Sequence, residues 1–213
     1  MKLYSYWRSS ASYRVRIALN LKGVAYGYQP INLLKDEQNS SDYLALSPQG
    51  LVPTLVTDTG AALTQSLAII EYLEEAHPAP ALLPRDPVQR ARARAIATAI
   101  ACEAQPFGNL RIMNYLKSEA GFSDEKRLAF LNRWAGGALH AVEQLARMTA
   151  GRFCVGDTPG MADIFLVPQL ATARRFMIEV ADCKTLLAID ANCAKLPAFE
   201  KARPENQPDA VKS

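Results

Sequence analysis

Hydrophobic and polar positions alternate with two different periods along the chain, and the change between them divides it. In residues 1–77, short strand-like alternation is interleaved with helical spacing. Strands are predicted at residues 2–6, 26–33, 51–56 and 61–64, and helices at 11–22, 43–46 and 67–76. Gly23 is the expected C-terminal stop of the first helix. The predicted order is therefore β-α-β followed by β-β-α.

The second part of the chain has a different pattern. Residues 78–87 hold four of the 13 prolines and are predicted to form an extended linker. Beyond them, helical periodicity without strand alternation covers residues 88–117, 124–148, 161–176 and 185–194. Pro106 and Pro168 should kink or interrupt two of these helices, and residues 204–213 should form a loose polar tail. The predicted fold class is an α/β domain, residues 1–77, followed by an all-helical domain, residues 88–213.

Composition narrows the chemistry that is possible. The 213 residues include two histidines and four cysteines, with no C-x-x-C pair, so we expect no metal site and no redox dithiol. A net charge of +3 without a basic block gives no reason to expect a nucleic-acid partner. There is no run of 18 apolar residues and no signal-like start, so no membrane contact is expected. Unpaired cysteines fit a reducing compartment, and a cytoplasmic protein is predicted.

Three short segments could carry chemistry. Ser9 and Ser10 stand where the first strand turns into a helix, and Gln65 and Ser66 precede a later helix. Helix N-termini present free N–H groups and favour anions, although a serine there is often only an N-cap. Pro53 opens a strand; in a cis peptide it would turn the main chain of the preceding residue toward a peptide-like ligand. None of the three segments is decisive alone.

The order of these three segments along the predicted β-α-β-β-α unit resembles that in the thioredoxin-like domain of glutathione transferases. Several runs resemble the zeta class of that family, which includes maleylacetoacetate isomerase and maleylpyruvate isomerase. These are S-S-A-S-Y-R-V-R-I-A-L at 9–19, Q-S-L-A-I-I-E-Y-L-E-E at 65–75, G-D-T-P-G-M-A-D at 156–163, L-V-P-Q at 166–169 and N-Q-P-D at 206–209. The resemblance covers essentially the whole chain. Two positions depart from it: Ala11 replaces a cysteine, and Gly160 replaces a serine or threonine that caps a helix together with Asp163.

The resemblance implies glutathione as the cofactor and assigns roles to individual residues. Ser9, Ser10 and Arg8 would act on the thiolate, with Ser9 as first choice. The residues expected to bind glutathione are Ser9, Ser10, Ala11, Gln38, Val52, Pro53, Gln65, Ser66 and Asn109. The residues expected to bind the carboxylates of the substrate, between the two domains, are Arg8, Asn109, Arg111 and Arg175.

The implied reaction is a reversible thiolate addition to a cis double bond conjugated to a ketone, rotation about that bond, and expulsion of the thiolate. The expected substrate is maleylacetoacetate, an intermediate of tyrosine and phenylalanine degradation. Maleylpyruvate of gentisate degradation, or a broader transferase activity on small α-halo acids, would use the same residues and stays open. So does a non-catalytic binding protein on this fold. A homodimer is implied by the family alone.

Overall fold

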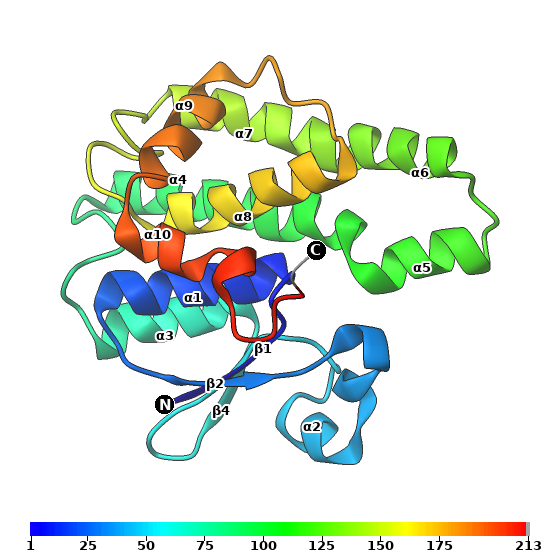
Figure 1. Cartoon of the computed structure of the whole chain (residues 1–213). Coiled ribbons are helices and arrows are strands. Elements are labelled where there is room, and N and C mark those ends of the chain that lie inside the picture. Colours follow the sequence, from blue (N-terminus) through cyan, green and yellow to red (C-terminus); the bar gives the residue numbers. More distant parts are fainter. Residues whose placement is uncertain (212–213) are drawn as a thin grey trace. The chain divides into compact units, whose positions relative to one another are not determined.

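The computed structural model describes residues 1–211, which form two compact units (Figure 1). One unit is Met1–Leu82 together with the described part of the segment that begins at Ala194; the other is Leu83–Cys193. The chain thus returns to its first unit, whereas the sequence pattern placed every residue after 88 in the helical domain. Asn20 and Arg16, on the first helix, explain the return: their side chains donate to the carbonyl oxygens of Ala198 and Ala202, each at 3.0 Å.

A mixed sheet of four strands forms the centre of the first unit. The strands are β1 (Lys2–Ser5), β2 (Gly27–Pro30), β3 (Thr54–Val56) and β4 (Ala62–Thr64), in the order β2-β1-β3-β4. β1 is parallel to β2 and antiparallel to β3, and β3 is antiparallel to β4. The predicted order of elements is confirmed, but the strands are shorter than predicted. Proline cannot donate to a ladder, and β2 ends at Pro30 while β3 begins just after Pro53.

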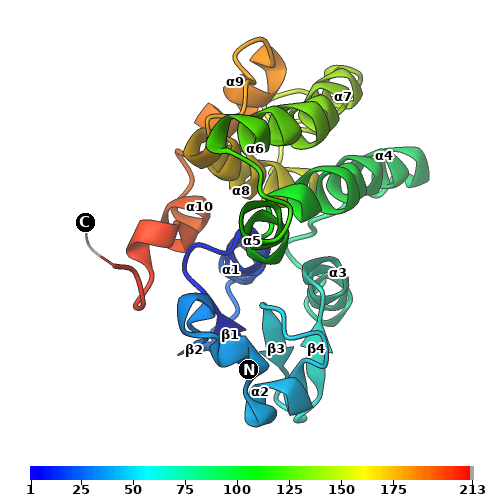
Figure 2. The same ribbon diagram turned by 90° about the vertical axis from the view of Figure 1, so that its right-hand side faces the viewer.

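Four helices accompany this sheet: α1 (Ser10–Lys22), α2 (Ser41–Leu46), α3 (Ser66–Ala76) and α10 (Pro197–Ala202). Short 3₁₀ turns occupy Leu33–Lys35, Glu37–Asn39 and Pro204–Asn206. Figures 1 and 2 show α1 and α3 side by side on one face of the sheet, with α2 beyond the other face. As predicted, α1 ends at Gly23, whose φ of 65° is the left-handed conformation that glycine tolerates.

The core of the first unit lies between the sheet and these two helices. Leu3 and Leu55 come from the sheet, Leu19 from α1, and Ile69 and Leu73 from α3; all are fully buried. Burying each such side chain contributes about 1.5–3 kcal/mol. This core fixes the positions at which α1 and α3 begin.

The second unit is helical, as predicted. Its helices are α4 (Pro87–Thr98), α5 (Leu110–Ser118), α6 (Asp124–Leu131), α7 (Gly137–Arg147), α8 (Met161–Phe176) and α9 (Lys184–Cys193). Wider π turns at Ala99–Ala104 and Asn132–Gly136 and a 3₁₀ turn at Gln105–Gly108 join them. Pro106 interrupts its helix as predicted. Pro168 does not: α8 runs through it, because the helix is buried from Met161 to Leu170 and this packing outweighs one lost hydrogen bond.

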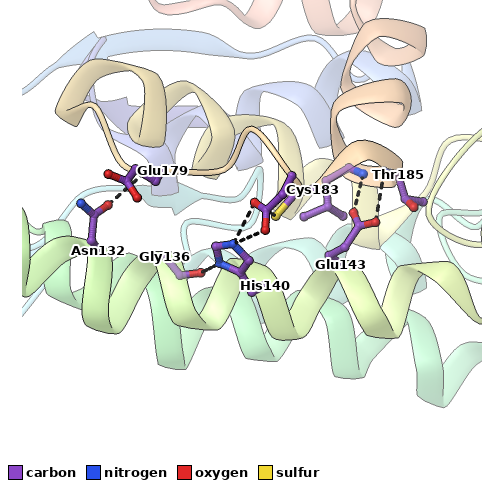
Figure 3. A network of polar contacts seen from close by, with 9 residues as sticks. Asn132, Gly136, His140, Glu143, Glu179, Cys183 and Thr185 are labelled. Atoms are coloured by element: carbon purple, nitrogen blue, oxygen red, sulfur yellow. Dashed lines mark hydrogen bonds and ion pairs between the residues drawn. The ribbon is translucent and has the colours of Figure 1, made fainter.

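Helix α7 holds the connection between α8 and α9 by a row of polar contacts (Figure 3). Asn132, in the turn before α7, accepts a hydrogen bond from the Glu179 N–H at 2.9 Å. Glu143 accepts from the N–H groups of Thr185 and Leu186, at 3.2 and 3.0 Å, and so caps the first turn of α9. His140 lies between these two contacts.

The predicted loose tail is wrong for the residues that the structure describes. Gln207 is buried, and its amide donates to the carbonyl oxygens of Lys201 and Arg203 at 2.9 and 2.7 Å. Asp209 accepts a hydrogen bond from the Tyr28 hydroxyl at 2.6 Å. Hydrogen bonds to the preceding carbonyl oxygens and to the Tyr28 side chain therefore order a segment whose composition predicted a loose tail. Over residues 1–211, none of the helices is both long and apolar enough to cross a membrane.

Candidate active site

The register of the sheet brings the predicted glutathione-binding segments of the first unit to one edge. Tyr4 pairs with Thr54, which pairs with Thr64, and Ser5 pairs with Pro30. The chain therefore leaves β1, β2 and β4 at the same end of the sheet at which it enters β3. The segments at that edge are the turn with Arg8, Ser9, Ser10 and Ala11, the loop with Gln38, the Val52–Pro53 pair, and the Gln65–Ser66 pair.

Ser9 is the N-cap of α1. Its Oγ accepts a hydrogen bond from the Ser12 N–H at 3.2 Å, and its own N–H donates to Tyr6 O at 3.0 Å. The capping interpretation is thus correct, yet it leaves the hydroxyl proton of Ser9 without an acceptor among the described residues. The N–H groups of Ser10 and Ala11 likewise donate to no described residue. Hydroxyl and helix N-terminus together form a donor set for an anion.

Arg8 adds positive charge beside this turn. Its side chain is exposed, and its guanidinium carbon lies 4.3 Å from the centroid of the Trp7 ring. A guanidinium stacked on an aromatic face keeps its hydrogen-bond donors free for a carboxylate or thiolate. The geometry is compatible with the role that the resemblance gave to Arg8.

Gln65 and Ser66 begin α3 in an unusual way. Gln65 is the N-cap position, with φ 66° and ψ 116°, a backbone conformation that costs a residue other than glycine about 1–3 kcal/mol. Its Nε2 donates to Gln49 Oε1 at 2.5 Å. Ser66 is not the N-cap that the pattern allowed for: it is the first residue of the helix, it is buried, and its Oγ accepts from Arg14 at 3.3 Å. Such strain is concentrated at functional sites.

Val52 and Gln38 offer groups that suit a peptide-like ligand. The Val52–Pro53 peptide bond is cis, as the resemblance required. Val52 is half-buried, and neither its N–H nor its carbonyl bonds to another described residue. Gln38 donates to Asp36 Oδ1 at 2.8 Å, while its own Oε1 is buried and accepts from no described group. A buried polar atom without a partner, such as Gln38 Oε1, is costly unless a ligand satisfies it, and the main-chain groups of Val52 are open to pairing, so these residues fit a tripeptide such as glutathione.

Two buried arginines of α1 are structural parts of this edge that the sequence pattern did not single out. Arg14 donates to Ser66 Oγ and thereby ties the start of α3 to α1. Arg16 donates to Tyr6 O at 3.4 Å and to Trp7 O at 3.0 Å, in the turn before Ser9. Their signal in the sequence was the presence of two arginines between apolar residues of one helix.

The remaining predicted residues belong to the second unit. Asn109 is the N-cap of α5 and accepts from the Arg111 N–H at 3.1 Å. Arg111 and Arg175 are exposed, and the Arg175 guanidinium stacks 4.5 Å from the Phe176 ring centroid. A Cβ at Gly108 would lie 3.7 Å from Phe176, so the start of α5 lies against the end of α8. The three predicted substrate-binding residues of this unit are therefore grouped in one region of it.

A fold with this sheet, this helical unit and this edge is that of a glutathione transferase, and comparisons with known proteins agree. The family model described as glutathione S-transferase, N-terminal domain, matches residues 8–76. Maleylacetoacetate isomerase of Pseudomonas aeruginosa is 47% identical over 98% of both chains.

Two solved structures are similar over nearly the whole chain. A holo maleylpyruvate isomerase, described as a bacterial zeta-class glutathione S-transferase, has a TM-score of 0.95 and 44% identity, covering 99% of this chain and 100% of its own. Maleylacetoacetate isomerase of Methylobacterium extorquens AM1, solved with malonate and glutathione, has a TM-score of 0.94 and 40% identity over 100% of both chains. The chain belongs to the zeta-class glutathione transferase family that contains the maleylacetoacetate isomerases.

Proposed function

We propose that this protein is a glutathione-dependent isomerase that converts maleylacetoacetate to its trans isomer, fumarylacetoacetate, in the degradation of tyrosine and phenylalanine. The observation that carries the proposal is the convergence of the Ser9 turn, the Val52–Pro53 pair and the Gln65–Ser66 pair at one edge of the sheet. The similarity to named maleylacetoacetate isomerases over nearly all of the chain supports the same substrate.

Glutathione, when bound, would supply the thiolate that adds reversibly to the double bond. The residues of this chain would then hold it in place. Gln65 and Ser66 would receive the γ-glutamyl end at the start of α3, and the free main-chain groups of Val52 would pair with the peptide. The Gln38 amide oxygen would accept an N–H. Ser9, rather than Ser10, would donate its hydroxyl proton to the sulfur.

The electrostatic task of these residues is to favour thiolate over thiol. A free thiol has a pKa of about 8.5 and is mostly protonated at neutral pH. The hydroxyl of Ser9, the N-terminal dipole of α1 and the charge of Arg8 all stabilise the anion and lower that pKa. Ala11, which stands where the zeta-class pattern has a cysteine, adds no group to this set, so the mechanism requires no thiol from the protein.

The substrate is a dianion, and arginine is the residue that pairs with carboxylates in two parallel hydrogen bonds. The resemblance assigns Arg8, Asn109, Arg111 and Arg175 to its carboxylates. Anchors at the two carboxylates would leave the bond between them free to rotate once it is single. The positive charge around the ketone would stabilise the developing enolate.

Maleylpyruvate isomerisation is the second candidate, and a specific observation favours it: a maleylpyruvate isomerase shares the fold of this chain with a TM-score of 0.95. Maleylpyruvate also carries a cis double bond conjugated to a ketone and two carboxylates, so the same residues would serve. Conjugation or dehalogenation of small α-halo acids would use the same sulfur site but consume glutathione.

The test is turnover with purified protein and a catalytic amount of glutathione. We expect many turnovers per glutathione, and kcat/KM for maleylacetoacetate above that for maleylpyruvate. Stoichiometric loss of glutathione would establish a transferase instead, and a reversed preference would establish the second candidate. Ser9→Ala should lower kcat at least tenfold, about the effect of one charge-stabilising donor, whereas a rate within about twofold of wild type would remove Ser9 from the mechanism.

The cellular setting is part of the same proposal. All four cysteines are free, which suits the reducing cytoplasm. We propose a homodimer, to be tested by light scattering at several protein concentrations. The mild net charge of +3 supports a small-molecule enzyme without a nucleic-acid partner.

A further inference from the structure

The turn that carries Ser9 is held by a residue from the far end of the chain. The Trp7 N–H donates to Asp209 Oδ2 at 3.0 Å, across 202 positions of sequence. The other carboxylate oxygen, Oδ1, accepts from the Tyr28 hydroxyl at 2.6 Å. Asp209 therefore joins the turn after β1 to the neighbouring strand β2 and uses both of its oxygens to do so.

The next peptide group, between Trp7 and Arg8, is held as well. Arg16 Nη2 donates to Trp7 O at 3.0 Å, and Arg16 Nη1 donates to Ser5 Oγ at 3.2 Å. Arg16 is fully buried, and its Nε donates to Ala202 O at 3.0 Å. The N–H and the carbonyl of Trp7 are thus both fixed, two positions before Ser9, and both fixing groups depend on the C-terminal segment.

The hydrogen bonds of Asp209 fix the geometry of the turn before Ser9 rather than add to the hydrophobic core. Asp209 is only half-buried, and the groups it binds are the main-chain N–H of Trp7, in the turn before Ser9, and the phenol of Tyr28, within β2. Arg8 and Ser9 follow Trp7 directly and lie at the surface or half-buried. A hydroxyl that must donate to a sulfur anion needs its direction fixed within a few tenths of an ångström, and the residues behind it provide that precision.

We propose that Asp209 is a positioning residue of the isomerase, which acts through Trp7 to orient Ser9 and the first N–H groups of α1 toward the glutathione sulfur. This rests on the proposed function of Ser9. Asp209 touches neither glutathione nor substrate in this assignment. Its contribution is to keep the turn in the one conformation that stabilises the thiolate.

The experiment measures the pKa of the enzyme-bound glutathione thiol from the ultraviolet absorbance of the thiolate as the pH is varied. Asp209→Ala removes both acceptors, while Asp209→Asn keeps one oxygen and places an amide against a donor. We expect the thiol pKa to rise toward its free value near about 8.5 in both variants. We expect kcat to fall by about tenfold in Asp209→Ala. The dissociation constant for glutathione should stay within about threefold, because the Gln65–Ser66 end of the site is unchanged.

Asp58→Asn is the matched control, since Asp58 is an exposed carboxylate of the same unit that pairs with the amino terminus. It should leave the thiol pKa and kcat unchanged. A lower melting temperature for Asp209→Asn with an unchanged thiol pKa would mean that Asp209 only stabilises the fold, and the proposal would be wrong.

A double-mutant cycle with Ser9→Ala separates this proposal from the one on which it rests. If Asp209 acts through Ser9, the effect of Asp209→Asn on the thiol pKa should largely vanish in the Ser9→Ala background. Equal effects in both backgrounds would overturn the positioning role. If Ser9→Ala itself leaves the thiol pKa unchanged, the assignment of Ser9 fails, which is a distinguishable result.

Discussion

Buried polar side chains hold together the edge of the first unit at which the candidate site lies. Arg14 donates to Ser66 Oγ at 3.3 Å, and both side chains are buried, so this hydrogen bond lies in a region without bulk water. Helical periodicity alone could not reveal this pair, because periodicity treats every arginine as a surface residue. The resemblance placed Ser66 at the site but did not show that a buried guanidinium holds it.

Ser66→Ala should therefore destabilise the protein and weaken glutathione binding together. Removing an acceptor from a buried charged donor costs about 1–3 kcal/mol, and for a chain of this size each kcal/mol lowers the melting temperature by about 2–4 °C. Chemical denaturation and calorimetry with glutathione measure the two effects. Ser41→Ala, at the exposed first position of α2, is the control and should change neither. A normal Ser66→Ala melting curve would show that Arg14 does not need this acceptor.

At the scale of a single element, the start of α8 shows how a helix tolerates a missing cap. Gly160 has no side chain to cap the helix, but Asp163 accepts from the Gly160 N–H and from the Cys154 N–H, both at 2.8 Å. Burial raises the pKa of Asp163, while these hydrogen bonds act in the opposite direction. Asp163 therefore still closes the start of α8 without a side chain at position 160, and its contact with Cys154 ties the preceding loop to the helix.

Asp163→Asn should cost about 2–3 kcal/mol, because an amide cannot accept from two N–H groups with both of its atoms. Gly160→Ser should stabilise by only a few tenths of a kcal/mol, since glycine is already an acceptable N-cap. Urea unfolding of both variants measures the changes, with Glu125→Gln in the exposed first turn of α6 as the control. If Asp163→Asn cost less than Gly160→Ser gained, the cap would depend on another group.

Helix α7 gives a prediction that depends on pH. His140 lies 2.8 Å from Gly136 O through Nδ1 and 2.9 Å from Asp182 through Nε2 (Figure 3). The hydrogen bond to the Gly136 carbonyl is the main cause that raises the pKa of His140 above 6.5, with smaller contributions from Asp182 and Glu143. The pKa of Asp182 is lowered by a hydrogen bond from the backbone N–H of Asp182 itself and by the hydrogen bond with His140. Because the folded pKa of His140 is the higher one, its stabilisation is complete below about pH 6.5 and is lost as the pH rises through the folded value.

Asp182→Asn should consequently lower the melting temperature by about 1–2 °C near pH 6, and the difference from wild type should close as the pH rises through the folded pKa of His140. The effect is small because both side chains are largely exposed. Added salt should reduce the difference at the lower pH by screening the pair. A difference that stays constant over this pH range would mean that His140 carries no charge in the contact.

At the scale of the whole molecule, the local hydrophobic pattern predicted the helices and strands better than it predicted which unit each of them belongs to. The order β-α-β-β-α and the position of α8 follow from periodicity and proline placement, and the site edge follows from strand order. The return of the chain after Ala194 does not, because it depends on side chains of α1 that bind carbonyl oxygens nearly 200 positions away. The strained backbone of Gln65 could not be predicted either, because a positive φ is indicated by glycine and position 65 is a glutamine.

The division into two units gives the last prediction, on unfolding with and without glutathione. The residues that we assign to glutathione lie in the first unit, apart from Asn109, and that unit is closed by the C-terminal segment. The second unit is thus inserted in the sequence between two parts of the first, so both of its ends lead into the first unit. We therefore expect one cooperative transition by calorimetry. Glutathione at about 100 times its dissociation constant should stabilise it by about 2.7 kcal/mol, which corresponds to a rise of about 5–10 °C. Two separate transitions, of which glutathione moves only one, would show that the units unfold independently.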